Sequence, residues 1–194
     1  CHTTRGGSIY GFRPAQLNRD FNYESATDNQ LRTLAHIGLF SEPLVAGYPA
    51  DSPPLDHSPR MTNPFDSEQS LAARARSYLH VNCGTCHRRG GGGTASIQLV
   101  EKYSLEEAGL FSKPTQGTFG IVDPWIVASG DPNRSVLYYR MSKLGRGRMP
   151  HFGSLSVDAD GIQLVHDWIQ HLDSPDSETV SDAAAQLQTI AESS

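Results

Sequence analysis

The amino-acid sequence predicts an all-α fold with much irregular chain around a small core. Four segments place apolar residues at helical spacing, and each begins near a residue that commonly caps helices. Hydrophobic residues make up only 37% of the 194 residues, and 18 glycines and 12 prolines indicate many turns. Contacts other than apolar side-chain packing are therefore expected to help hold the fold together.

The first helix is expected within residues 28–39, with Asp28 as its N-cap. Its apolar face carries Leu31, Leu34, Ala35 and Leu39. Residues 41–67 are rich in Pro, Ser and Asp and have no sustained period, which predicts a linker or a long wrapping loop. Residues 1–66 are therefore interpreted as an irregular N-terminal extension with one short helix.

The second helix is expected to begin near Asp66, because Gln69 three residues later completes the pattern of a capping box. It runs directly into Cys83. One apolar stripe follows its length, formed by Leu71, Ala72, Ala75, Tyr78 and Leu79.

The third helix is expected to start at Asp131, with Pro132 at its first position and Gly145 near its end. The fourth covers residues 158–172, and Trp168 lies beside its apolar face.

Residues 174–194 are expected to form a C-terminal tail, either partly helical or disordered. The predicted organisation is thus an extension (1–66), a domain (67–173) and this tail.

Charge and hydropathy exclude two classes of function. The chain has 16 basic and 21 acidic residues, a net charge of −5, whereas a nucleic-acid-binding protein would need a basic surface. No apolar run approaches the roughly 18 residues of a membrane-spanning helix. We therefore expect no nucleic-acid partner and no transmembrane segment.

The segment "NCGTCH" contains Cys83, Cys86 and His87, and three chemistries use such a pattern. A structural zinc site would need two further ligands, and no second CxxC exists. A redox dithiol should follow a strand and open a helix, whereas this motif follows a predicted helix and runs into glycines. The third chemistry is covalent haem attachment, with thioethers on both cysteines and the adjacent imidazole on the iron. This is the prediction that we adopt.

A sixth iron ligand is available in Met149, which lies in a predicted loop directly before Pro150. A thioether sulfur suits low-spin iron. Met61 precedes the motif, and Met141 lies on a predicted helix where core packing explains it. His151 is the rival ligand, two residues further along.

Taken together, "NCGTCH", the glycine-rich loop, "SGDPNRSVLYYRM", "RMP" and a terminal helix with "HDWI" resemble a class I cytochrome c. More narrowly, "ARARSYLHVNCGTCHRRGGGG" is similar to cytochrome c domains appended to larger secreted bacterial redox proteins. The resemblance covers residues 67–173. It implies the all-α class I cytochrome c fold around one covalently bound haem c.

Carried over to this chain, the resemblance places the thioethers on Cys83 and Cys86, the proximal ligand on His87 and the distal ligand on Met149. It also implies that the helix before the motif crosses the C-terminal helix, with Tyr78 and Trp168 near the contact.

Two features of the sequence stay open. The stretch between Gly90 and Gly130 is longer than in a minimal member of the family, and what it covers is not predicted. The four glycines of residues 90–93 either let the chain pass close over the macrocycle or form an exposed flexible loop.

The resemblance implies electron transfer, by a carrier or by the terminal module of a larger redox protein such as a dehydrogenase. No catalytic residue is predicted, because two filled axial positions leave no site for a substrate. Basic residues flank both ligand segments and predict an acidic redox partner: Arg88, Arg89, Lys143, Arg146 and Arg148. The alternatives are a peroxidase-like haem enzyme or gas sensor, which requires Met149 to leave the iron, and a structural subunit of a multihaem assembly.

Haem is attached to such motifs outside the bacterial cytoplasm, so the resemblance implies a periplasmic or extracellular location. Cys1 and His2 have three interpretations. They are the remainder of a truncated CxxCH motif with a second haem, the lipid-anchored start of a lipoprotein, or a chain end without a chemical role.

Overall fold

A computed structural model describes residues 12–40 and 60–172. Contacts divide the chain into two compact units, with a boundary between Met61 and Thr62. We call residues 12–40 and 60–61 the N-terminal unit, and residues 62–172 the main unit. Cys1, His2 and the predicted tail lie outside the described residues.

The N-terminal unit contains two short helices and one hairpin. Its elements are α1 (Pro14–Leu17), β1 (Asp20–Asn22), β2 (Thr27–Asn29) and α2 (Gln30–His36). The strands pair antiparallel. The sequence predicted neither the hairpin nor α1, because three-residue strands with mostly exposed side chains leave no alternating apolar pattern.

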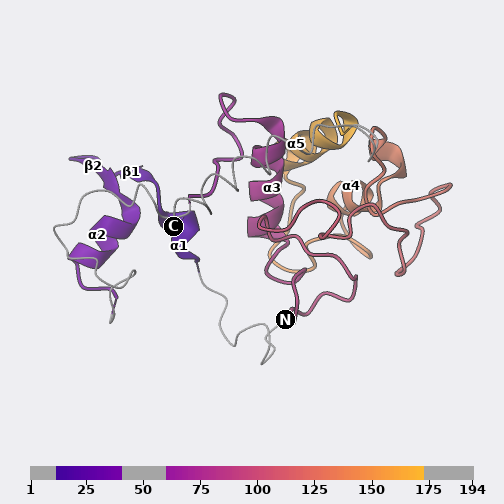
Figure 1. Ribbon diagram of the computed structural model, residues 1–194, viewed down its shortest axis with the longest axis horizontal. Coiled ribbons are helices and arrows are strands. Elements are labelled where there is room, and N and C mark those ends of the chain that lie inside the picture. The colour runs from indigo at the N-terminus through magenta and orange to yellow at the C-terminus, as the bar shows by residue number, and fades with distance from the viewer. Residues whose placement is uncertain (1–11, 41–59, 173–194) are drawn as a thin grey trace. The chain divides into compact units, whose positions relative to one another are not determined.

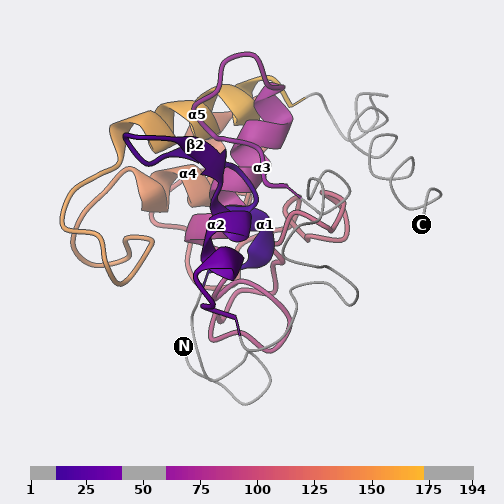
Figure 2. The same cartoon turned by 90° about the vertical axis from the view of Figure 1, so that its left-hand side faces the viewer.

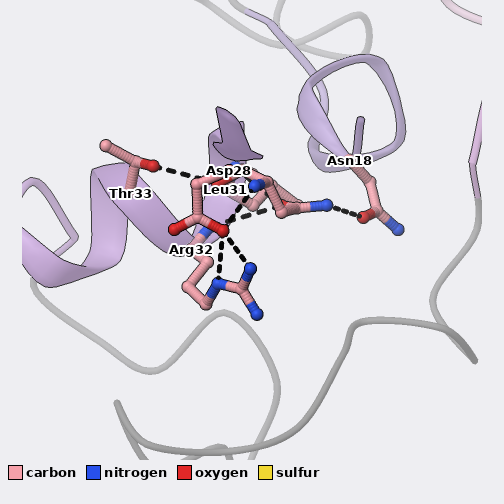
Figure 3. A network of polar contacts seen from close by, with 6 residues as sticks. Asn18, Asp28, Leu31, Arg32 and Thr33 are labelled. Carbon is pink, nitrogen blue, oxygen red and sulfur yellow. Dashed lines mark hydrogen bonds and ion pairs between the residues drawn. The ribbon is translucent and has the colours of Figure 1, made fainter. Parts of the chain in front are cut away.

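Asn29, and not the predicted Asp28, caps α2. Its Oδ1 accepts hydrogen bonds from the backbone N–H groups of Leu31 at 3.0 Å and Arg32 at 3.3 Å. Its Nδ2 donates to Oδ1 of the buried Asn18 at 2.9 Å. Asp28 instead pairs with the Arg32 guanidinium, one turn along the helix (Figure 3). The N-cap prediction was wrong by one residue, because either side chain could accept these bonds.

The helix before the motif is α3 (Leu71–Asn82), and its N-cap is Ser70, whose hydroxyl accepts from Ala73 N at 3.3 Å. The predicted capping box of Asp66 and Gln69 is therefore wrong. Asp66 forms a separate turn, in which its Oδ1 accepts from Glu68 N at 3.1 Å.

The predicted third helix is split into η2, a 3-10 helix (Pro132–Arg134), and α4 (Val136–Met141). Asp131 caps η2 as predicted. Contacts with another segment cause the split: Val136 N donates to the Trp125 carbonyl at 2.8 Å, and Leu137 N donates to the Ile126 carbonyl at 3.0 Å. These amides are therefore bonded to a neighbouring segment, and Ser135 has extended backbone angles.

The last helix, α5 (Ala159–Gln170), begins after its N-cap Asp158, close to the predicted range. It packs against α3, and both views show the two helices side by side (Figures 1 and 2). Tyr78 and Trp168 belong to the same buried cluster, so the predicted crossing of these helices is confirmed. Gly161 permits the close approach, because a Cβ there would overlap the Tyr78 ring.

The stretch between residues 94 and 130 is irregular but forms part of the core. Its buried side chains join those of α3 and α5 in one cluster: Ile97, Leu99, Ala108, Leu110, Ile126 and Val127. Backbone bonds hold it in place, including Val127 N to the Leu110 carbonyl at 3.0 Å and Gly130 N to the Ile169 carbonyl at 2.9 Å. This segment supplies much of the apolar packing of the main unit.

Within residues 62–172 the regular elements of the main unit are helices. The two-stranded sheet lies in the N-terminal unit. The all-α class I cytochrome c fold stays a prediction.

Candidate functional site

One tight turn at the end of α3 carries the three motif residues. The helix ends at Asn82, and Cys83 is its C-cap. The Cys83 carbonyl accepts from Cys86 N at 3.1 Å and from His87 N at 2.9 Å. These two bonds place Cys83, Cys86 and His87 within a single turn of chain.

Gly84 allows this turn to pack against its neighbours. A Cβ at this position would lie 2.6 Å from the His80 carbonyl oxygen and 2.9 Å from the Leu99 carbonyl oxygen. Leu99 N also donates to the His87 carbonyl at 2.7 Å. The stretch between residues 94 and 130 therefore contacts the motif on one side. The close approach of the two backbones requires a glycine at position 84 of the motif.

The two thiols are free, with no disulfide between them. Burial, and then the neighbouring Cys86, raise the pKa of the Cys83 thiol to about 12. Reactive dithiols work through a lowered thiol pKa, so this environment does not favour redox exchange. Within residues 12–40 and 60–172, no three His, Cys, Asp or Glu side chains could together hold a metal ion.

The His87 side chain is buried, and its Nδ1 has no hydrogen-bond partner among the described residues. This nitrogen faces Gly93, where a Cβ would lie 2.9 Å from it. Burial lowers the pKa of His87, and the electrostatic influence of Arg140 and His151 lowers it further. These effects favour the neutral imidazole, which is the form that binds metals.

The glycine-rich loop packs on the motif itself. A Cβ on Gly91 would overlap the Cys86 carbonyl, and one on Gly93 would crowd the His87 ring. Two of the glycines are thus required by close contacts within the protein, an explanation that sequence reasoning missed.

Met149 lies half-buried in the loop between α4 and α5. Its N–H donates to the Arg140 carbonyl at 2.8 Å. Arg140 and His151, which lie near Met149 in the sequence, are close enough to His87 to lower the pKa of its imidazole. Met141 is the last residue of α4 and packs against the core, as predicted, whereas Met61 belongs to the N-terminal unit.

Arg140 is the residue that sequence reasoning missed at this site. It is half-buried, its Nε donates to the Gly147 carbonyl at 2.8 Å, and its guanidinium lies 5.3 Å from the centre of the Phe119 ring. In the sequence, Arg140 is only one of several basic residues near Met149. Phe119 lies in a weakly patterned segment, so no sequence signal could link the two side chains.

The surface of the Met149 loop combines apolar and basic side chains. Phe152 is 75% exposed and Leu155 is 96% exposed. The Arg148 side chain forms a hydrogen bond within the loop, in which its Nε donates to Ser154 Oγ at 3.2 Å. The Lys143 ammonium group donates to the Arg146 carbonyl at 2.8 Å.

No helix in the described part of the chain combines the length and apolar character needed to cross a membrane. In comparisons with known proteins, no protein-family model, no curated protein and no solved structure gives a significant match to this chain.

Proposed function

We propose that residues 67–173 form a c-type cytochrome domain that carries one haem and transfers electrons. The observation that carries the proposal is the turn at the end of α3, a single turn of chain that carries two free thiols and a buried imidazole. These donors fit the group: thiols for two thioether bonds, and an imidazole whose Nδ1 is packed against Gly93, leaving Nε2 as the ligand atom that we assign. A bound haem would supply reversible one-electron transfer.

Cys83 and Cys86 would hold the group covalently, His87 would bind on one side and Met149 on the other. Two protein ligands would leave no open position for a substrate, so we propose an electron-transfer protein and not an enzyme.

The proposed partner is a redox protein with an acidic docking surface. The exposed apolar side chains Phe152 and Leu155 lie in the same loop as Arg146 and Arg148, which suits a transient interface with an apolar centre and steering charges. Electron-transfer rates with such a partner should fall as salt increases, and Arg146→Glu should lower the rate at low salt. Rates that do not depend on salt would contradict this assignment.

We propose a periplasmic or extracellular location, because the attachment chemistry implied by the motif takes place outside the bacterial cytoplasm. Fractionation of intact cells tests this: the holoprotein should accompany a periplasmic or secreted marker. Holoprotein found with a cytoplasmic marker alone would refute the location.

Haem attachment is tested by the mass of the intact chain under denaturing and reducing conditions. The chain, produced with haem-attachment machinery, should retain one haem at this motif, and the double variant Cys83→Ala/Cys86→Ala should lose it. Cys1→Ala is the matched control, a cysteine outside the motif, and should keep the haem on Cys83 and Cys86. Release of the haem from the unmodified chain on denaturation would refute covalent attachment.

A further inference from the structure

Arg140 is a partly buried cation at the end of α4, and the described part of the chain offers it no acidic partner. No carboxylate in residues 12–40 or 60–172 forms an ion pair with it. Burial lowers the pKa of its guanidinium. Burying a cation costs free energy unless other contacts compensate, so we expect the Arg140 side chain to form specific contacts.

The guanidinium is held between an aromatic face and a loop carbonyl. Its centre lies 5.3 Å from the centroid of Phe119, within the range of a cation–π contact, and its Nε donates to the Gly147 carbonyl at 2.8 Å. Gly147 has a φ of +85°, and a Cβ there would lie 2.9 Å from Cε1 of Phe119. The three residues therefore pack as one unit, which we call the Arg140 clamp (Phe119, Arg140 and Gly147).

The main chain of Arg140 binds the same loop at a second point, because its carbonyl accepts from Met149 N at 2.8 Å. One residue of α4 thus holds the loop at positions 147 and 149. Other hydrogen bonds of the loop are internal, such as Arg148 N to the Gly145 carbonyl and Ser154 Oγ to the Pro150 carbonyl. These shape the loop but do not attach it to α4.

We propose that Arg140 is the positioning residue for Met149: the Arg140 clamp fixes the loop so that the sulfur stays at the iron. The inference rests on the proposed function, in which Met149 is the distal ligand. A loop released from its attachment at Gly147 should let Met149 leave the iron more often, which opens the distal side to small ligands.

The test uses the ferric holoprotein and imidazole as the probe. Two readouts are measured by optical titration: the dissociation constant of imidazole and the amplitude of the long-wavelength absorption band that methionine sulfur gives on ferric haem. Arg140→Gln should bind imidazole on the order of tenfold more tightly and show a weaker band, because it loses a charge-assisted hydrogen bond. Gly147→Ala disrupts the same clamp without changing any charge and should shift both readouts in the same direction.

Two further variants calibrate the result. Arg134→Gln removes an exposed arginine that pairs with Asp123, and it should leave both readouts unchanged. Met149→Ala should abolish the band and give the tightest imidazole binding. If Arg140→Gln does not fold, Arg140→Lys replaces it: it keeps the charge but lacks the planar Nε–H, so imidazole affinity should still rise.

The outcomes distinguish a failure of the role proposed for the Arg140 clamp from a failure of the assignment of Met149 as the ligand. Unchanged imidazole affinity and band in the Arg140 and Gly147 variants, with a large effect of Met149→Ala, would overturn the clamp and leave Met149 as the ligand. If Met149→Ala itself changes neither readout, the ligand assignment fails and the clamp fails with it.

Discussion

The hydroxyl of Tyr78 on α3 donates a hydrogen bond to Oδ2 of Asp158, the N-cap of α5, at 2.7 Å. The other oxygen of Asp158 accepts from Gly161 N at 3.0 Å. One carboxylate therefore caps α5 and joins it to the helix that leads into the motif. The bond between Tyr78 and Asp158 therefore holds α3, the helix that leads into the motif, against α5.

Tyr78→Phe should lower the free energy of unfolding by about 1 kcal/mol, because it removes a partly buried hydrogen bond between α3 and the N-cap of α5. Guanidinium denaturation of the holoprotein measures the change. Tyr138→Phe is the matched control, since the Tyr138 ring packs near His166 and its hydroxyl forms no hydrogen bond within residues 12–40 and 60–172. Equal stability of the two variants would show that the link between the helices contributes nothing.

Alkaline pH should weaken the same link. Burial raises the pKa of Tyr78, and Asp158 raises it further. The folded protein therefore holds this proton more tightly than the unfolded chain, so the contribution is complete below about pH 10 and is lost as pH rises above it. Unfolding free energies measured between about pH 8 and pH 11 should fall more steeply for the unmodified protein than for Tyr78→Phe. Parallel curves would contradict the assignment.

Gly161→Ala should destabilise the protein by about 1–3 kcal/mol, because the added methyl group overlaps the Tyr78 ring at the contact between α3 and α5. This loss should outweigh the gain of about 1 kcal/mol that alanine brings within a helix. Thermal or denaturant unfolding measures it. In a Tyr78→Leu background the same substitution should cost less, and an unchanged cost would show that the ring is not the cause.

Gly84→Ala should disturb the motif, because its Cβ would meet two backbone carbonyls that cannot move aside easily. We expect a lower yield of protein with attached haem, and a loss of stability of about 1–3 kcal/mol in the fraction that forms. Thr85→Ala, at the next position, is the control. Equal yields of the two variants would mean that the turn tolerates a side chain at residue 84.

Met149→Ala should leave the haem attached but make the ferric iron partly high-spin and lower its potential. The iron should also become open to imidazole in the ferric state and to CO in the ferrous state. If His151 takes over as ligand, the iron stays low-spin, and adding His151→Ala then opens it. Met141→Ala should cost about 2 kcal/mol, because Met141 is only partly buried, with little spectral change. The reverse pattern would mean that Met141 is the ligand.

The sequence predicted α5 well, because its signals are local, and the other elements less well, because contacts with other segments decide their limits. Asp158 followed by a regular apolar period defines α5 almost completely. The start of α3 was misplaced, because Asp66 and Ser70 are both capable caps and only tertiary packing selects between them. The break at Ser135 depends on Trp125 and Ile126, which are distant along the sequence.

At the candidate site, too, local features could be predicted from the sequence and contacts between segments could not. The spacing of Cys83, Cys86 and His87 is visible in the sequence because one turn of chain makes the site. The contact of Arg140 with Phe119 joins residues from two segments, and neither carries a pattern that could predict the other.

An engineer who wishes to shorten this domain should not cut between residues 94 and 130, although that stretch has the irregular look of a dispensable insertion. Its Leu110 and Val127 fill the interior, and its Leu99 holds His87 through the backbone. Excision would leave the faces of α3 and α5 uncovered and the motif without a support on that side. Trimming has to begin elsewhere.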